Sequence, residues 1–549
     1  PNKRKKANEV LISLQRQDGK HENAFQILKC PWCGTSMDQK GSLGYVRLKS
    51  SVRYVCPETR CDFSRNNREK TLPILVIDED IYDTPPTLII GTVDKFAMLA
   101  WTENAGSIFG GMGVSPPEVI IQDELHLISG PVGTMVGLYE SVIGDLCIDE
   151  NGVGPKIVGS TATIRRARDQ CAALYNRDVV QFPPQGLTAS DNFFAVENKE
   201  DPGRLYLGFM PTGASSFVTG LVRAFAALFE GVNEIDATDE IKDGYWTLIQ
   251  YYNSLRELGR GVTFLQQDIP EWMSIRARAD GRRARGIYHF NELTARKNSD
   301  EIPKILEALS IGKSEEKNSK PFDSLLATNM ISVGVDVPRL GLMAVVGQPK
   351  TTSEYIQASS RVGRGSAPGL VVACYNPSKA RDRSHFETFT QYHNAIYRHV
   401  EPTSVTPYAV PALEKALHAV LIIAARHIAK VVNPSDFDRE DSRFTAFCER
   451  LRQRCYQIDP FHVEVLDEMI EQFVGKTWDP SWHDSWGSLS GFDSSEKSLM
   501  APPNTSREDM HGKAVATPSS MRGVDSECEA EVLYQRGLSS GDQEARNER

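Results

Sequence analysis

The sequence lacks the long uncharged apolar run that a membrane protein needs. Its most apolar helical stretch, HAVLIIAARHIAKVV at residues 418–432, is interrupted by Arg426, His427 and Lys430. That stretch is too short and too charged to cross a bilayer. No apolar segment of the kind that directs secretion stands near the start, and no repeat of fixed period is visible. We therefore expect a cytoplasmic protein that does not use a membrane.

An excess of positive charge is also missing. Among 549 residues, 62 Lys and Arg stand against 72 Asp and Glu, which gives a formal net charge of −10. This balance excludes a uniformly basic coat for nucleic acid but leaves room for a local basic groove. The length predicts about three domains. A composition that is 40% hydrophobic and 24% charged is ordinary for a globular chain.

The third absence is a phosphate-binding loop. Many ATP-hydrolysing proteins carry the motif G-x-x-x-x-G-K-[ST], whose backbone N–H groups hold the phosphates. Two near matches fail, because the first glycine is replaced by Glu307 before the segment IGKS and by Ile470 before VGKT. The chain also begins at Pro1. We therefore expect this chain to be part of a longer protein, with the phosphate loop lying outside it.

Ten cysteines are present, and four of them stand in two close pairs. Cys30 and Cys33 lie in CPWCG, Cys56 and Cys61 lie in CPETRCDF, and 22 residues separate the pairs. Four thiolates at such spacing can surround zinc tetrahedrally and leave no open position for catalysis. Two buried thiol pairs or a disulfide are the alternatives. Because a reducing compartment disfavours disulfides, the spacing predicts one structural Zn²⁺.

Apolar runs that alternate with helical patterns predict an α/β fold with parallel sheets. A first series of strands is expected in TLPILVID, TLIIGT, EVIIQDE and PKIVGST. A second series begins at GRLYLGF and continues through YWTLIQYYN, GVTFLQ, DSLLATN, GLMAVVG and GLVVACYN. Further along, apolar residues recur at helical spacing, and the last part has the composition of a largely disordered tail.

These patterns predict a chain of six parts. Residues 1–28 form a polar segment whose basic cluster is either a solvated end or a nucleic-acid contact. The parts that follow are a zinc-binding module at 29–65, an incomplete α/β domain at 66–200, a second α/β domain at 201–400, a helical domain at 401–486 and a largely disordered tail at 487–549.

Two adjacent carboxylates follow the strand expected in EVIIQDE. Asp123 and Glu124 would lie at the carboxyl edge of a parallel sheet, where open α/β folds bind ligands. There they could hold a hydrated Mg²⁺ and orient an attacking water. Considered alone, two acids after a strand could equally begin a solvated helix.

Polar motifs after the later strands favour the ligand site. These motifs are GSTAT with Ser160, Thr161 and Thr163, LLATNMISVGVDVP with Thr328, Gly334 and Asp336, and YIQASSRVGRG with Gln357, Arg361 and Arg364. On a helix the two arginines would share one face and could clamp phosphate oxygens. Separately, the first motif could be a helix cap and the arginines could be surface charge. All of them together, in this order, favour a nucleotide site.

This order of motifs resembles the superfamily 2 helicases and translocases. The resemblance implies two tandem RecA-like parallel-sheet domains, the first one incomplete, with a zinc-ribbon-like insert and a C-terminal helical region. It implies that Glu124 activates water for ATP hydrolysis and that Asp123 handles Mg²⁺. Arg361 and Arg364 would reach the γ-phosphate in the manner of arginine fingers, with Gln357 as the matching glutamine.

The same resemblance implies roles for the other motif residues. Gly334 and Asp336 would contribute to nucleotide binding. Thr92 in IIGTVDKF, Asn253 in YYNSLRELG and Thr328 would contact the nucleic-acid strand. Coupling between hydrolysis and strand movement would involve Ser160, Thr161 and Thr163.

Longer segments resemble one family more narrowly. DELHLISGPVGTMVGLYE, HFNELTARKNSDEIPKIL, GQPKTTSEYIQASSRVGRG and the late SSMRGVD are similar to the DrmA family of helicase subunits in the DISARM anti-phage system. That resemblance implies ATP and Mg²⁺ as cofactors beside the expected Zn²⁺. It also implies foreign DNA, single-stranded or as a duplex end, and a DrmB-like partner subunit.

Three interpretations of function remain open. The first is the C-terminal part of an ATP-dependent DNA helicase or translocase in anti-phage defence, with little ATP hydrolysis by this chain alone. The second is a non-catalytic nucleic-acid-binding scaffold, and the third is a zinc-ribbon scaffold for protein interaction. The intact acids and arginines argue against the second, because a site that binds no ATP has no physical need for them.

Overall fold

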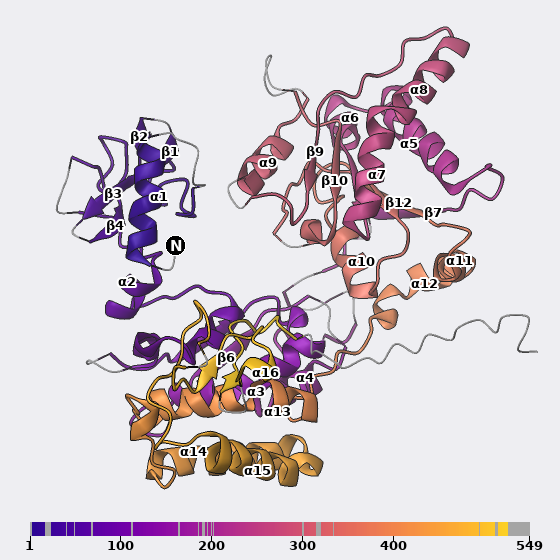
Figure 1. Cartoon of the computed structure of the whole chain (residues 1–549). Coiled ribbons are helices and arrows are strands. Elements are labelled where there is room, and N and C mark those ends of the chain that lie inside the picture. The colour runs from indigo at the N-terminus through magenta and orange to yellow at the C-terminus, as the bar shows by residue number, and fades with distance from the viewer. Residues whose placement is uncertain are drawn as a thin grey trace, which may run out of the picture. The chain divides into compact units, whose positions relative to one another are not determined.

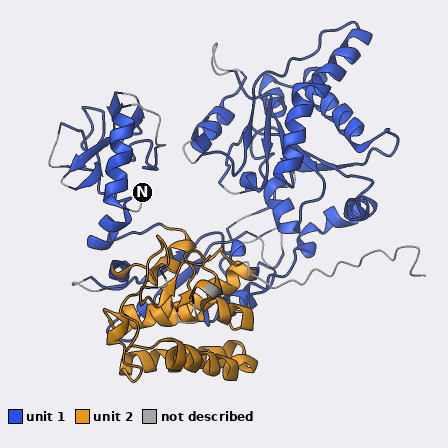
Figure 2. Ribbon diagram, viewed as in Figure 1, with its two compact units in different colours: residues 1–90, 104–130, 144–405 blue, residues 91–103, 131–143, 406–549 orange. Residues whose placement is uncertain are grey.

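The computed structural model gives the fold of most of the chain (Figure 1). The described residues are 3–16, 23–39, 41–48, 50–66, 70–110, 114–162, 165–184, 186–188, 191, 193–194, 196–198, 200, 203–298, 301–313, 320–332, 334–493, 495–510 and 514–524. They divide into two compact units (Figure 2). Unit 1 comprises residues 1–90, 104–130 and 144–405, and unit 2 comprises residues 91–103, 131–143 and 406–549. None of the described helices has the length and apolar character needed to cross a membrane.

Unit 1 begins with a small module that has its own core. Helix α1 (Arg4–Arg16) packs on the antiparallel hairpin of β3 (Tyr45–Leu48) and β4 (Ser51–Tyr54). A second short pair, β1 (Asp38–Gln39) and β2 (Ser42–Leu43), lies beside it. Buried side chains of the helix and the two hairpin tyrosines form one cluster with three of the four cysteines of the predicted metal site.

A buried acid ties this module together. Asp80 of α2 (Asp78–Asp83) is 2% exposed and accepts hydrogen bonds from Ser51, Arg4 and Arg53. Burial alone would raise the pKa of Asp80, but these three donors outweigh it and hold that pKa below its usual value. The carboxylate therefore stays charged and links the helix, the hairpin and α2.

The first α/β part contains a parallel pair of strands within the described residues. β5 (Val119–Gln122) pairs in register with β6 (Lys156–Gly159). Val119 and Ile121 of β5 are 53% and 68% exposed. Parallel sheets are normally covered on both faces, so this pair presents an apolar face that the described residues of the chain leave open.

Two expected strands of the first series are absent from the structure. Residues 71–78 and 87–92 contain no strand, and Leu88 and Ile90 are strongly exposed. Apolar runs of this length become strands only when a neighbouring strand accepts their backbone hydrogen bonds. The description of these two segments as strands was wrong for this structure.

The second α/β part is a six-stranded sheet in which every neighbouring pair is parallel. The strands lie in the order β7 (Arg204–Phe209), β12 (Gly369–Cys374), β11 (Leu342–Val346), β8 (Leu248–Tyr252), β10 (Ser324–Ala327) and β9 (Phe290–Leu293). β8, β10 and β11 are buried along their whole length. This confirms the predicted α/β class and the parallel sheet.

Helices cover both faces of this sheet. Ile249 and Tyr251 of β8 pack into one core, and Leu248 and Tyr252 of the same strand pack into the other. The first core is covered by α9 (Glu301–Ser310), α10 (Thr352–Ser359) and α12 (Phe389–Asn394). The second is covered by α5 (Phe217–Glu234), α7 (Leu255–Gln266) and α8 (Asp268–Ala279), and α6 (Asp239–Trp246) precedes β8.

One expected strand of the second series is helical. GVTFLQ was predicted to be a strand, but it forms the end of α7. Ser254 caps the helix through a hydrogen bond from Glu257 N, and Leu258 and Leu265 are buried at helical spacing. The cap and the 3.6-residue period outweighed the local β-forming composition. Conversely, β9 was missed, because only one of its four residues, Leu293, is fully buried.

A buried ion pair holds the start of β10. Arg285 and Asp323 are almost fully buried, and Nη2 of Arg285 lies 3.0 Å from Oδ1 of Asp323. Oδ2 of Asp323 accepts from the backbone of Tyr288 and His289. The Arg285 guanidinium also lies 3.6 Å from the ring centre of Trp246. Because β10 leads to Thr328 and the motif after it, this pair helps to place the predicted site.

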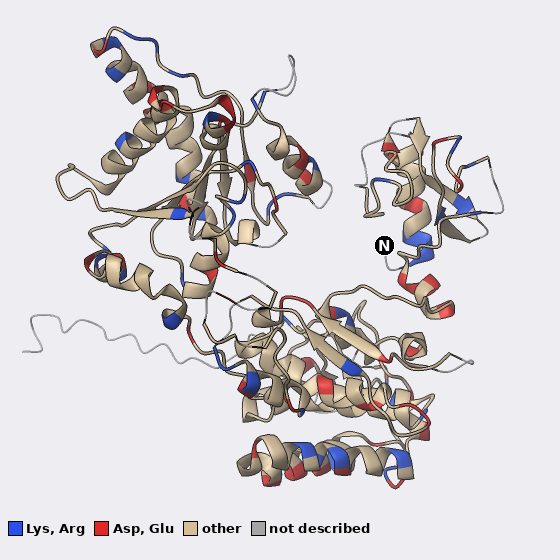
Figure 3. Cartoon of the chain, turned by 180° about the vertical axis from the view of Figure 1, so that it is seen from behind, with Lys and Arg blue, Asp and Glu red and all other residues tan. Residues whose placement is uncertain are grey.

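Unit 2 is mainly helical. Helix α13 (Val410–Ile423), continued by a π turn to Ile428, contacts α15 (Val463–Gln472), which in turn packs against α14 (Ser442–Ile458). The charged residues of α14 are mainly basic and those of α15 are all acidic (Figure 3), and one pair, Arg452 and Asp467, lies 2.9 Å apart. This confirms the expected helical region. The helix α3 (Gly130–Leu146) has residues in both units, and α4 (Ala167–Tyr175) belongs to unit 1.

The segment after residue 487 has more structure than its composition suggested. β13 (Met500–Ala501) pairs in parallel with β14 (Val515–Ala516), and Leu499, Thr517 and Met521 are fully buried. The expectation of a largely disordered tail therefore needs correction for the described residues of 487–524. Residues 525–549 lie outside the described residues. The other domain boundaries remain predictions.

Asp323→Ala is expected to destabilise the second α/β part by about 3–5 kcal/mol, because it leaves the Arg285 charge buried without a partner. Native-state hydrogen exchange of the β10 amides measures this loss. The matched control is Glu387→Ala, which removes an exposed acid 3.9 Å from Arg383 and should cost at most about 1 kcal/mol. Equal effects of the two substitutions would contradict the structural role of the buried pair.

Candidate functional site

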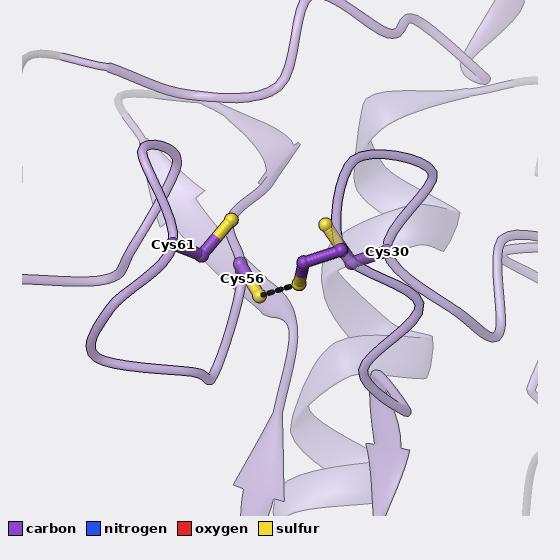
Figure 4. A group of neighbouring side chains, drawn as sticks. Cys30, Cys56 and Cys61 are labelled. Carbon is purple, nitrogen blue, oxygen red and sulfur yellow. Dashed lines mark hydrogen bonds between the residues drawn. The ribbon is translucent and has the colours of Figure 1, made fainter.

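The four cysteines of the two pairs converge on one place in the first module (Figure 4). Their sulfur atoms all lie within 4.8 Å of one another, and Sγ of Cys33 is 3.4 Å from Sγ of Cys56. All four are free thiols. A tetrahedral zinc with bonds of about 2.3 Å needs sulfurs separated by about 3.8 Å. The cluster therefore suits a structural metal, and a disulfide is not formed.

The turns that carry the cysteines are fixed by backbone hydrogen bonds. Gly34 N donates to Cys30 O at 2.8 Å, and Cys56 N donates to Phe63 O at 2.7 Å. A hydrogen bond with Thr35 lowers the pKa of Cys33 to about 6, whereas burial raises the pKa of Cys56 and Cys61. Bound metal would keep all four sulfurs as thiolates, which are its ligands.

The acidic pair stands directly after β5, as predicted. Asp123 is exposed, and its Oδ1 accepts a hydrogen bond from Glu124 N at 3.0 Å. Glu124 has a positive φ of 50°, an uncommon conformation for a residue with a side chain. This turn bends the chain so that Leu125 N donates to Ser160 O at 2.9 Å. The acids and the start of the GSTAT motif are thus neighbours.

The GSTAT motif is described only in part. Ser160 N donates to Gln122 O at 2.9 Å, which continues the pairing of β5 and β6. Thr161 is exposed, and its hydroxyl donates to Ala162 O. Thr163, the third residue expected to couple hydrolysis with movement, lies outside the described residues.

A histidine connects the acids to the later motif. Nδ1 of His126 lies 3.3 Å from Oε2 of Glu124, and the side-chain nitrogen of Gln357 contacts Nε2 of His126. An amide nitrogen can only donate, so Nε2 accepts and the proton of the neutral ring stays on Nδ1, facing Glu124. Burial lowers the pKa of His126, although Glu124 opposes the shift. The ring is therefore neutral near pH 7.

Arg361 is held in place by backbone oxygens. Its guanidinium donates to Val335 O at 3.0 Å and also to Ser332 O. Burial is the largest cause that lowers the pKa of Arg361 and Arg364 adds to it, while Glu124 and Asp336 oppose the shift. Glu124 is therefore close enough to act electrostatically on Arg361. The predicted catalytic residues Glu124, Gln357 and Arg361 lie together in unit 1.

Arg364 has a different partner. Its Nη1 donates to Oδ1 of Asp336 at 2.9 Å, and Nε donates to Ser360 O at 2.8 Å. Asp336 is 75% exposed on its side chain. Gly334 has a φ of 74°, which glycine adopts without strain. Asp336 therefore lies beside Arg364, two residues after the turn at Gly334.

The predicted strand-contacting residues are divided between the two units. Asn253 follows β8 and donates to the backbone oxygens of Val346 and Gly347 at 3.1 and 3.2 Å. Thr328 follows β10 and is 8% exposed. Both belong to the carboxyl edge of the six-stranded sheet, whereas Thr92 is exposed in unit 2. Their role in strand contact stays a prediction.

Three residues with evident positioning roles were not assigned from the sequence. His126 was visible in DELH but had no expected partner. Gln170 is 1% exposed, donates to Leu125 O and Ile128 O, and accepts from Thr403. Asp382 is buried and accepts from Gln348 N at 3.1 Å. The contacts of His126 with Gln357, of Gln170 with Thr403 and of Asp382 with Gln348 join residues at least 34 positions apart, so no local pattern could have revealed them.

Part of the chain matches a known protein family. Residues 277–366 match the helicase conserved C-terminal domain. The match includes β9, β10, β11 and α10. It also contains the predicted residues Thr328, Gly334, Asp336, Gln357, Arg361 and Arg364.

A curated relative is similar over a much longer stretch. The DISARM protein DrmA of Bacillus paralicheniformis (strain ATCC 9945a / NCIMB 11709 / CD-2) is 40% identical over 445 residues, which cover 73% of this chain. The chain is related to DrmA. The aligned stretch covers 39% of the length of that relative. The predicted resemblance to superfamily 2 helicases, and to DrmA among them, is confirmed.

Two solved helicase structures are more distant. The DUF1998 helicase MrfA bound to DNA is 15% identical, with 69% of this chain and 46% of that chain covered and a TM-score of 0.46. Helicase Lhr of Mycobacterium smegmatis, bound to single-stranded DNA and AMP-PNP, is 14% identical, with 75% and 43% covered and a TM-score of 0.47. Likenesses this shallow do not bear on function.

The purified chain is expected to contain about one zinc, lost in the double variant Cys30→Ser with Cys56→Ser. Elemental analysis by mass spectrometry measures the metal. The matched control is Cys448→Ser, which changes a cysteine of α14 outside the module. Because a structural zinc site contributes directly to folding, the double variant should also lose hydrogen-exchange protection in β3 and β4. Metal content well below one in the unchanged chain would refute the site.

Proposed function

We propose that this chain is the C-terminal part of an ATP-dependent DNA translocase or helicase of anti-phage defence. The observation that carries the proposal is the grouping of Glu124, His126, Gln357 and Arg361 within unit 1. These side chains come from segments more than 200 residues apart, yet Gln357 contacts His126 and Arg361 lies within electrostatic reach of Glu124. A scaffold without nucleotide chemistry has no need of such a group.

The acidic side of the group suits hydrolysis. Glu124 would orient an attacking water and accept its proton, and neutral His126 lies beside it, with Nδ1 3.3 Å from Oε2 of Glu124. Asp123, exposed at the end of β5, would bind Mg²⁺, a hard cation that prefers carboxylate oxygens. When bound, Mg²⁺ would offset the negative charge of the phosphates.

The basic side would come from the α10 segment. Arg361 is already fixed by the carbonyls of Ser332 and Val335, so little reorganisation would be needed to present it to phosphate. Arg364 would exchange its ion pair with Asp336 for the γ-phosphate. Two guanidinium groups aimed at developing charge are the arginine-finger arrangement of phosphoryl transfer. Gln357, through His126, would link this segment to Glu124.

The phosphate loop is proposed to come from sequence outside these residues. The chain spans about two fifths of the relative DrmA, and neither near match contains the required first glycine. The apolar face of β5 and β6 supports this, since a complete parallel sheet would cover Val119 and Ile121. We further propose that the assembled protein works with a DrmB-like partner and that Zn²⁺ stabilises the N-terminal module.

In the full-length protein, Glu124→Gln is expected to preserve ATP binding and to abolish turnover. Arg364→Ala is expected to reduce turnover by a factor on the order of 10³ if it acts as an arginine finger. Steady-state ATP hydrolysis in the presence of single-stranded DNA measures the turnover of both variants. The matched controls are Glu387→Gln and Arg383→Ala, an exposed pair elsewhere in unit 1. Normal turnover in either site variant would contradict the assignment.

Residues 1–549 alone are expected to hydrolyse essentially no ATP, because their sequence contains no G-x-x-x-x-G-K-[ST] motif to supply the amides and lysine of a phosphate loop. Binding of single-stranded DNA should persist weakly and fall steeply with rising salt, since such binding is largely ionic. Hydrolysis and fluorescence anisotropy are compared between this chain and a version extended upstream. Robust DNA-stimulated turnover by the chain alone would overturn the proposal that the loop lies elsewhere.

A further inference from the structure

The turn that carries Thr92 is held by residues near the end of the chain. Asp94 lies in the 3₁₀ helix Val93–Leu99, two positions after Thr92. Its Oδ1 accepts hydrogen bonds from Ser520 Oγ at 2.7 Å and from Met521 N at 3.1 Å. Its Oδ2 lies 3.1 Å from Nε of Arg522. Three consecutive residues of the SSMRGVD motif therefore close on one carboxylate.

Other contacts within unit 2 fix the far end of the same segment. Nε1 of Trp101 donates to Pro518 O at 3.0 Å. Arg426 donates to Ala100 O, and Nε2 of His427 donates to Leu99 O, both at 2.8 Å. His427 is 5% exposed, and burial lowers its pKa to about 4, so this donor stays neutral at physiological pH. Residues 99–101 thus have little freedom.

The clamping residues are themselves anchored. β14 pairs with β13, and Thr517 N then donates to Ala501 O at 2.9 Å. Thr517 and Met521 are fully buried. The four residues from Pro518 to Met521 are therefore fixed between the β13–β14 pair and the buried side chain of Met521. They can hold the Thr92 turn in one conformation.

The charge of Asp94 makes this contact relevant to nucleic acid. Thr92 is exposed, and an uncompensated carboxylate two residues away would repel a phosphate that approached it. The side chain of Asp94 is 25% exposed, and that of Arg522 is 71% exposed. Arg522 therefore cancels the charge of Asp94 at the surface where strand contact is predicted.

We propose that Ser520, Met521 and Arg522 form a clamp on Asp94, which orders the Thr92 turn and neutralises it for strand binding. These three are positioning residues, because they act through the turn. The inference rests on the proposed function, since it takes Thr92 as a strand contact. It gives a role to SSMRGVD, which the nucleotide site does not use.

The decisive test is a charge rescue in the full-length protein. Arg522→Ala should weaken binding of a labelled oligothymidine about tenfold, because Asp94 is left uncompensated. Asp94→Asn alone should change the affinity less than threefold, since an amide oxygen can still accept from Ser520 and Met521. The double variant should recover most of the lost affinity. Fluorescence anisotropy at several salt concentrations measures all four proteins.

A direct phosphate contact by Arg522 predicts a different pattern. Asp94→Asn would then give no recovery, and the slope of log affinity against log salt would fall by about 0.7 in the Arg522→Ala protein. That result would overturn the clamp. A double variant that recovers with an unchanged salt slope supports it.

A second measurement does not depend on DNA. Asp94→Ala removes all three contacts and should speed hydrogen exchange in residues 93–101. Asp467→Asn, which breaks the Arg452 pair on α14 and α15, is the control and should leave that segment unchanged. Unchanged exchange in Asp94→Ala would refute the ordering role. Absence of strand binding by the unchanged protein would instead refute the proposed function, while the exchange result still decides whether the turn is clamped.

Discussion

The structure of the second α/β part depends on burying parallel strands on both faces. Backbone groups of β8, β10 and β11 are paired on either side, and their side chains fill two separate cores. All six strands point the same way, so the residues that follow them emerge along one edge. Asn253, Thr328 and Gly347 each follow a strand of this sheet. The sheet thus determines where chemistry can be placed, before any side chain takes part.

Buried polar contacts then set the exact position of elements on this frame. Asp323 and Arg285 secure one end of β10, and Asp382 accepts from Gln348 N in the loop after β11. Asp80 plays the same part in the N-terminal module. Each is an acid removed from water whose cost is offset by several donors. Such contacts specify one arrangement, because any shift leaves a charge without a partner.

The first α/β part shows the effect of leaving one face of a parallel strand pair uncovered. β5 and β6 carry the acidic pair but expose Val119 and Ile121. The acids still adopt a defined turn, because Glu124 N donates to Oδ1 of Asp123 and Leu125 N donates to Ser160 O. Local geometry of a site can therefore persist where the surrounding sheet is open. Binding a triphosphate requires more, since phosphate needs many backbone donors at once.

The sequence alone determined the class of fold, the four cysteines and the motifs of the proposed nucleotide site, because each depends on local spacing or on a recognisable order along the chain. Its errors were also local in origin. GVTFLQ had strand-like composition but joined a capped helix, and residues 87–92 lacked a pairing partner. Only the tertiary structure decided that His126 meets Gln357 and that Ser520, Met521 and Arg522 meet Asp94. Those contacts join residues hundreds of positions apart, and their partners are chosen by packing of whole elements, which no local pattern encodes.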